Sequence, residues 1–140
     1  SSDLERIGDH AINIASRAQK LAEDDTHFSA DALKEISIME SLCNNILDEL
    51  IILDYDEFKN IVDKVDVMED NIDKTQHQFT VNQLIRLKEK KCSTENSIIY
   101  TKILTDFERI GDHGLNIAES LYHIRKIMKQ MKMIKPEIEE

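Results

Sequence analysis

The sequence has few of the residues that break helices or form tight turns. Among its 140 residues there are one proline, three glycines and no tryptophan. A protein built from many strands and turns needs more of these residues, whereas abundant Ile, Leu, Glu, Asp and Lys favour long helices. The length is that of about one domain. We therefore expect a single all-α domain over residues 1–140.

Three further absences exclude classes of protein. Cys43 and Cys92 are too few and too far apart for a disulfide framework or a cysteine metal site, so we expect free thiols in a reducing compartment. No apolar run approaches the roughly 18 residues that span a bilayer. The net charge of −10 repels phosphate backbones and anionic lipids but suits cations. We expect no nucleic-acid partner, and membrane contact only through an attached or partner protein.

The spacing of apolar residues predicts four amphipathic helices joined by short connections. Ser29 is a predicted N-cap, and Asp54 with Glu57 forms a predicted capping box. Long helices with short connections pack as antiparallel neighbours, so we predict an antiparallel up-down helical bundle. The predicted helices cover about residues 3–23, 29–53, 54–90 and 95–134.

One charged segment occurs twice in the chain. "DLERIGDHAINIA" at residues 3–15 returns as "DFERIGDHGLNIA" at residues 106–118, with ten of thirteen positions identical. A helix places residues i and i+4 one above the other, so the acidic pair in each copy is stacked on one face. Stacked carboxylates repel each other unless a cation or an arginine lies between them, and they are natural ligands for hard metal ions. The pairs are Glu5 with Asp9, and Glu108 with Asp112.

A glycine precedes the aspartate in both copies, as Gly8 and Gly111. Glycine inside a helix costs about 1 kcal/mol relative to alanine. We therefore expect another group to approach the helix backbone closely at both positions.

The predicted hairpin of the last two helices brings further carboxylates to the second copy. If the chain turns near residue 92, residue 73 lies level with about residue 112, because both helices rise ~1.5 Å per residue. Glu69 and Asp73 then join Glu108 and Asp112, provided that the two helices turn these faces toward each other. If they do not, the acids simply form a solvated surface. No acidic helix precedes the first copy, so Glu5 and Asp9 are expected to form half a site.

The neighbours of the acidic pairs are expected to be structural. We predict that His113 lies beside the apolar edge of its helix with Arg109 and Asp106, and that Arg109 pairs with Asp106. His10 occupies the same place in the first copy.

The two repeated segments resemble the signature of PhoU-type proteins, regulators of bacterial phosphate uptake. The resemblance implies two three-helix repeats, with residues 1–23 as the end of the first and residues 29–134 as the second. It also implies a mononuclear or multinuclear metal site, with iron or zinc as the metal. "EDNID" at residues 69–73 resembles the acidic motif of the middle helix. The implied ligands are Glu5, Asp9, Glu69, Asp73, Glu108 and Asp112.

The function expected from this resemblance is a regulatory metal-binding module in phosphate uptake and homeostasis. Our main expectation is the cytoplasmic domain of a sodium/phosphate cotransporter-related protein, at the inner face of the cell membrane. The alternatives are a free-standing PhoU-type regulator and a purely structural helical bundle. The implied partners are a phosphate transporter or signalling protein, and a second copy, since helices absent from the first repeat would leave an apolar helix face uncovered.

No catalytic pattern is present. Di-iron carboxylate enzymes use Glu-x-x-His pairs, and the sequence contains none. It also lacks a nucleophile–base pair and a glycine-rich phosphate loop. We expect a protein that is not an enzyme.

Overall fold

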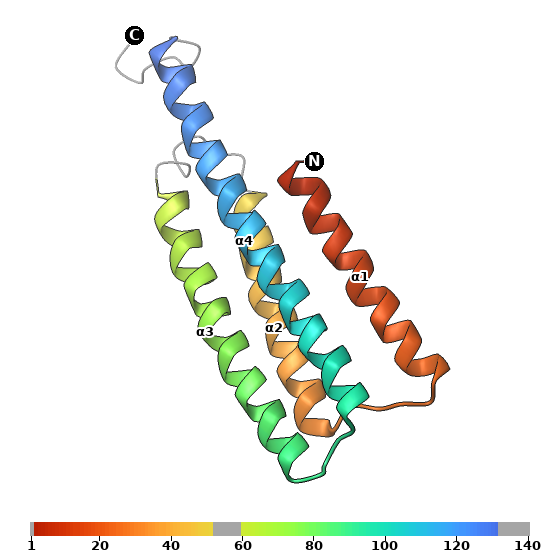
Figure 1. Cartoon of the computed structure of the whole chain (residues 1–140). Helices are drawn as coiled ribbons and strands as arrows, with labels where there is room; N and C mark the ends of the chain where they lie inside the picture. Colours follow the sequence, from red (N-terminus) through yellow and green to blue (C-terminus); the bar gives the residue numbers. More distant parts are fainter. Residues whose placement is uncertain (1, 52–59, 132–140) are drawn as a thin grey trace.

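The computed structural model describes residues 2–51 and 60–131, and these form four helices (Figure 1). The described residues contain no strand, so the predicted all-α class is confirmed. None of these helices is both long enough and apolar enough to cross a membrane. The helices are α1 (Asp3–Glu23), α2 (Ala30–Leu50), α3 (Ile61–Lys88) and α4 (Thr94–Gln130).

Serine side chains begin three of the helices. Ser2, Ser29 and Ser93 each accept a hydrogen bond from the backbone N–H three residues further on, at the start of α1, α2 and α4. The prediction for Ser29 is confirmed. Helix α2 ends at Leu50, a little before the predicted end at residue 53. The predicted Asp54–Glu57 capping box lies outside the described residues.

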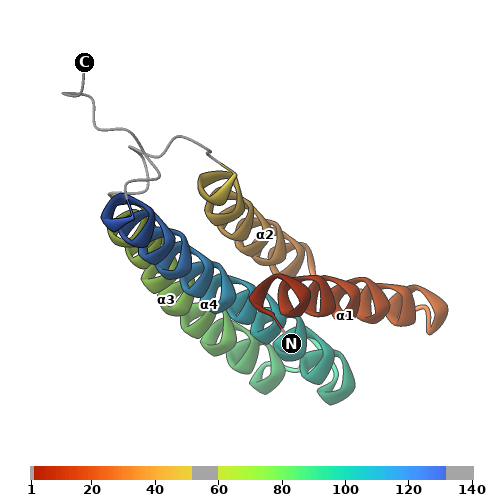
Figure 2. The same ribbon diagram turned by 90° about the horizontal axis from the view of Figure 1, so that it is seen from above.

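The helices form an up-down arrangement with α4 at its centre. Helix α4 contacts each of the other three helices, and α2 also contacts α3. Helix α1 contacts α4 alone and runs antiparallel to it, on the side away from α3 (Figures 1 and 2). The predicted antiparallel bundle is therefore confirmed, with α2, α3 and α4 as a three-helix unit and α1 attached to one side.

The hydrophobic core lies inside the three-helix unit. Helix α1 adds Ile7 and Leu21 to the core, whereas its Leu4 and Ile12 are 72% and 65% exposed. An apolar face of α1 is thus left open in the described chain. The largest fully buried side chains are Met39 and Ile46 of α2, Val65 and Ile72 of α3, and Tyr100 and Leu104 of α4.

A buried acid, Glu35, connects the start of α2 with the end of α3 and the start of α4. The carboxylate of Glu35 accepts hydrogen bonds from Tyr100 Oη at 2.5 Å, Arg86 Nη2 at 2.6 Å and Asn82 Nδ2 at 2.7 Å. Burial raises the pKa of Glu35, but the bonds from Arg86, Tyr100 and Asn82 outweigh it, so that the pKa lies below its ordinary value. This network fixes the ends of α2, α3 and α4 relative to one another.

Both cysteines are free thiols. Cys43 is buried, its thiol donates to the backbone oxygen of Phe107 at 3.2 Å, and burial raises its pKa to about 12. Cys92 is half-buried. The expectation that the two do not pair with each other is confirmed.

Candidate metal centre

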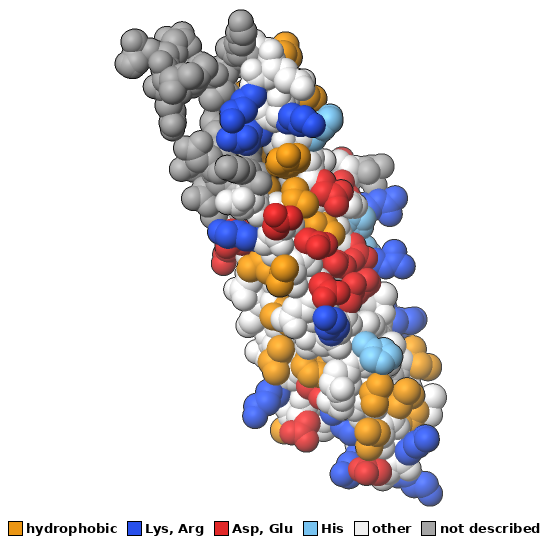
Figure 3. Space-filling view, turned by 90° about the vertical axis from the view of Figure 1, so that its left-hand side faces the viewer, with side chains coloured by type: hydrophobic (Ala, Val, Ile, Leu, Met, Phe, Trp, Pro, Cys, Tyr) orange, Lys and Arg blue, Asp and Glu red, His pale blue; other side chains and the backbone are white. Residues whose placement is uncertain are grey.

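Carboxylates from α3 and α4 meet in the middle of one face of the bundle. Glu69, Asp73 and Asp112 each place one oxygen within 4.8 Å of the others. Figure 3 shows acidic side chains gathered in this part of the surface. The prediction that Asp73 lies level with Asp112 is confirmed, and the two helices turn these faces toward each other.

Glu108 is the fourth member of this acidic cluster, which we define as Glu69, Asp73, Glu108 and Asp112. Burial, followed by the neighbouring Asp112 and Asp73 carboxylates, raises the pKa of Glu108 to about 7. Burial and the same two neighbours raise the pKa of Glu69 to about 8. Negative charge on all four carboxylates is unfavourable unless a proton or a cation neutralises some of it.

One oxygen of the cluster has no partner. Asp73 Oδ1 is buried, and it accepts no hydrogen bond from the described residues. A buried acceptor without a donor costs free energy, and a metal ion is one group that would satisfy it. The donors are all carboxylate oxygens, which hard cations prefer. The residues therefore fit the metal site that the sequence predicts at the second copy.

Gly111 leaves room for α3 to pack closely against α4. A Cβ added at Gly111 would lie 3.1 Å from Ile72 Cδ1, on the part of α3 between Glu69 and Asp73. The expected close approach at Gly111 is confirmed, although the approaching group is a side chain of α3. The same expectation for Gly8 is wrong for the described chain, because none of the described residues lies within 4 Å of a Cβ at that position. Among the described residues, no helix covers α1 in the way that α3 covers the second copy.

The first copy does not join the acidic cluster. Glu5 and Asp9 are exposed on α1, and in the described part of the chain neither belongs to a group of three or more ligands close enough to share an ion. That these two residues form half a metal site stays a prediction.

The two copies instead bind each other through their histidines. His10 Nδ1 lies 2.9 Å from Asp106 Oδ1, and His113 Nδ1 lies 2.8 Å from Asp3 Oδ1. The two imidazole rings stack with centroids 5.8 Å apart. Hydrogen bonds from His113 and from a neighbouring amide lower the pKa of Asp3. The exchange is reciprocal, because each aspartate opens one copy of the motif and bonds the histidine of the other.

These contacts correct two predictions. Asp106 pairs with His10 and with Arg17, whose Nε lies 3.0 Å from Asp106 Oδ2, rather than with Arg109. Arg109 lies 3.8 Å from Glu108. His113 bonds Asp3, so its partner lies on α1 instead of its own helix. That His113 has a structural role stays a prediction. The signal in the sequence was the equal seven-residue spacing from aspartate to histidine in both copies.

A family model described as PhoU domain matches residues 36–121, which include all four residues of the acidic cluster. The chain belongs to the PhoU family. The match therefore covers most of α2, all of α3 and most of α4.

Curated relatives extend the PhoU similarity over nearly the whole chain. "Phosphate-specific transport system accessory protein PhoU homolog 1" of Thermotoga maritima is 30% identical over 132 residues, which are 93% of this chain and 56% of that protein. The PhoU homolog of Clostridium acetobutylicum is 27% identical over 128 residues, 88% of this chain and 55% of that protein. A PhoU homolog from a Burkholderia species is 30% identical over 129 residues, 89% of this chain and 53% of that protein.

The chain thus spans about half the length of the curated PhoU relatives that it matches. No solved structure matches it significantly. The relatives are named as accessory proteins of a phosphate-specific transport system. Their names give no support to the expectation of a cotransporter tail.

Proposed function

We propose that this PhoU-family chain is a metal-binding regulator of phosphate transport and homeostasis. Family membership and the names of the relatives support a free-standing accessory protein better than a cotransporter domain. Its partner is then a phosphate transporter or a signalling protein. The proposed place of action is the cytoplasmic face of the cell membrane, reached through that partner.

Metal binding is supported by the carboxylates of Glu69, Asp73 and Asp112, each of which places one oxygen within 4.8 Å of the others. In addition, Asp73 Oδ1 is buried and accepts no hydrogen bond from the described residues. Glu69 and Asp73 come from α3, and Asp112 comes from α4 with Glu108 one turn before it. A bound cation would neutralise these charges and hold the two helices together. Of iron and zinc, the all-carboxylate donor set favours iron in its harder ferric state, since zinc prefers nitrogen and sulfur ligands.

The role of the bound metal would be electrostatic and structural. It would convert a strongly negative patch, of the kind seen in Figure 3, into a nearly neutral one. A surface whose charge depends on metal loading can discriminate between partners, because charge complementarity governs encounter and specificity.

The test is metal content and metal-dependent stability of the purified chain. We expect bound iron in protein prepared without chelator, and about 2.7 kcal/mol of added stability when free metal is 100-fold above its dissociation constant. Asp112→Asn should abolish both effects. Asp9→Asn is the matched control, because Asp9 holds the same motif position but is exposed outside the cluster.

Three outcomes would decide against metal binding at the acidic cluster. Near-zero metal content, or melting that neither chelator nor added iron changes, would favour a purely structural bundle whose acids only solubilise it. Equal loss of metal in Asp112→Asn and Asp9→Asn would show that binding does not occur at the acidic cluster.

We further propose that two copies associate through the open apolar face of α1. The support is the exposure of Leu4 and Ile12 on a helix whose duplicated counterpart in α4 is covered by α2 and α3. Exposed apolar side chains grouped on one helix face are typical of an interaction surface.

A further inference from the structure

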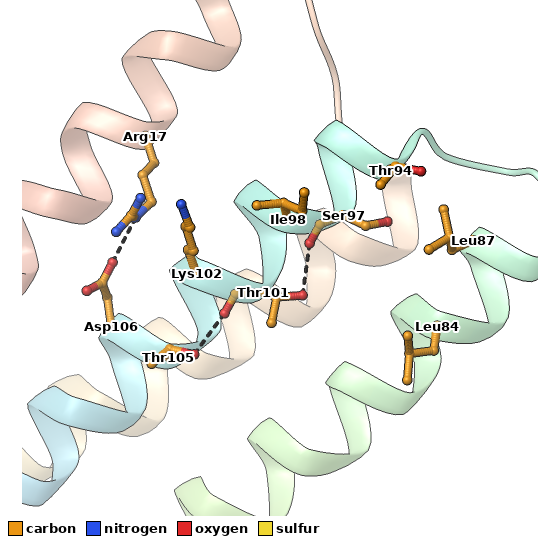
Figure 4. A pocket seen from close by; sticks show the side chains of 10 residues that line it. All are labelled: Arg17, Leu84, Leu87, Thr94, Ser97, Ile98, Thr101, Lys102, Thr105 and Asp106. Carbon is orange, nitrogen blue, oxygen red and sulfur yellow. Dashed lines mark hydrogen bonds and ion pairs between the residues drawn. The ribbon is translucent and has the colours of Figure 1, made fainter.

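A groove of about 470 Å³ runs along α4 between α1 and α3, separate from the acidic cluster. Figure 4 shows α4 as its floor, Arg17 of α1 on one side, and Leu84 and Leu87 of α3 on the other. It belongs neither to the proposed metal site nor to the open apolar face of α1.

The floor of this groove is less polar than its residues imply. Thr101 Oγ1 donates a hydrogen bond to the backbone oxygen of Ser97 at 2.8 Å, and Thr105 Oγ1 donates to that of Thr101 at 3.0 Å (Figure 4). Both hydroxyls are therefore used by their own helix, which leaves methyl groups for a ligand to contact. Ile98 and Leu84 are 50% and 55% exposed in the same groove. The groove offers apolar surface that the bundle itself does not cover.

The shape of the floor fits another helix. Four of its residues, at positions i, i+4, i+7 and i+11 of α4, lie on one face of that helix and span about 17 Å, or three turns. Side-chain rows at this spacing accept the rows of a second helix, and an amphipathic helix lying in an apolar groove is a recurring mode of recognition. The four residues are Thr94, Ile98, Thr101 and Thr105.

The rim of the groove supplies an unused positive charge. Arg17 is held by the buried Asp106 at 3.0 Å. Lys102 is exposed, and within residues 2–51 and 60–131 it takes part in no ion pair. In a chain whose net charge is −10, a cation left at the edge of an apolar groove favours an occupant with an acidic side chain at that point.

We propose that this groove binds an amphipathic helix of a partner protein. The apolar face of the partner helix lies on the row of α4 side chains from Thr94 to Thr105. An acidic residue on the flank of the partner helix pairs with Lys102. Continued along α4, the same face reaches Glu108 and Asp112, so the partner helix would end beside the acidic cluster. The proposal does not depend on metal binding, because no groove residue is a proposed ligand.

The experiment uses a fluorescein-labelled synthetic helical peptide of about 18 residues, five turns, with leucines on one face and glutamates on its flanks. A peptide of the same composition with scrambled leucines is the control, and a third peptide carries lysine in place of glutamate. Fluorescence anisotropy is measured with the full chain at 0.15 M salt, where charges further apart than about 8 Å are screened. We expect the amphipathic glutamate peptide to bind at least tenfold more tightly than the scrambled one.

Matched variants locate the binding. Ile98→Glu should weaken binding at least tenfold, whereas Ile124→Glu, the same change at a 48% exposed position of α4 outside the groove, should leave it unchanged. Leu84→Glu on α3 repeats the test from the opposite wall. Lys102→Glu should reverse the preference, so that the lysine peptide binds more tightly than the glutamate peptide. Circular dichroism checks that each variant is folded.

Three results would overturn the proposal. They are equal binding of the amphipathic and scrambled peptides, binding that Ile98→Glu and Leu84→Glu do not weaken, and absence of binding by every peptide. The chain could also self-associate in a way that Ile98→Glu removes and Ile124→Glu leaves unchanged. That result would show that the occupant of the groove is a second copy of the chain instead of a partner protein.

Discussion

The same substitution in the two copies of the repeated motif should change stability in opposite directions. Gly8→Ala adds a methyl group where none of the described residues lies within 4 Å. It should therefore gain the helix propensity of alanine, about 1 kcal/mol. With an unfolding entropy of about 2.1 cal/mol/K per residue, a chain of this length melts roughly 3 °C higher for each 1 kcal/mol.

Gly114→Ala should have the opposite effect, although the first copy already carries alanine at the equivalent Ala11. The new Cβ would lie 2.7 Å from Ile46 Cγ2, and Ile46 is completely buried. The β-branched Ile46 cannot swing this methyl away without a different χ1 rotamer, and overpacking of this kind costs about 1–3 kcal/mol. After the gain in propensity is subtracted, a net loss of up to about 2 kcal/mol remains.

Thermal and urea unfolding followed by circular dichroism measure both effects. Gly111→Ala should fall between the other two, because its nearest contact is the movable end of Ile72 at 3.1 Å. A stabilised Gly114→Ala would refute the packing argument. A destabilised Gly8→Ala would mean that α1 is covered in solution, and sedimentation equilibrium would then show whether a second copy covers it.

Two more predictions follow from the ionisable groups. Glu69 and Glu108 keep protons up to about pH 8 and pH 7 in the folded chain, but only to the ordinary value of 4.5 when unfolded. The metal-free folded state thus binds more protons, and its free energy of unfolding should fall as the pH rises from 4.5 to 8, by about 1–2 kcal/mol because both groups are partly exposed. Urea unfolding with chelator measures this, and stability that rises with pH would contradict it. Separately, Arg86→Ala should cost roughly 3 kcal/mol, because it leaves Glu35 buried without its cation. Tyr100→Phe should cost only about 1–2 kcal/mol in the same assay, and equal costs would contradict this ranking.

The helices, and the height of the acidic groups along them, could be predicted from the sequence. Both depend only on the period of the apolar residues and on the helical rise per residue. The 3.6-residue spacing gave α1 its bounds, and counting from the turn brought Asp73 to Asp112. The rotation of α3 against α4 could not be predicted in this way. It depends on shape, here on Ile72 filling the space that Gly111 leaves open.

The contacts between the two copies of the motif could not be predicted, for a different reason. Local rules pair Asp106 with Arg109 at i+3, but a buried aspartate satisfied by two donors from another helix is more stable than an exposed local pair. The pairing of Asp106 with donors from α1 could be considered only once the position of α1 against α4 was known. The same holds for Gly8, whose open surroundings follow from how α1 is attached and not from its own sequence.

The exchanged aspartate–histidine bonds bear on how such a chain can originate. Because each motif supplies what the other needs, a shorter ancestor with a single motif could form both bonds by meeting a second copy of itself around a twofold axis. Duplication and fusion would then turn contacts between molecules into contacts within one chain, at a far higher effective concentration. In the fused chain, replacing the histidine of one half removes a hydrogen bond from the aspartate of the other half.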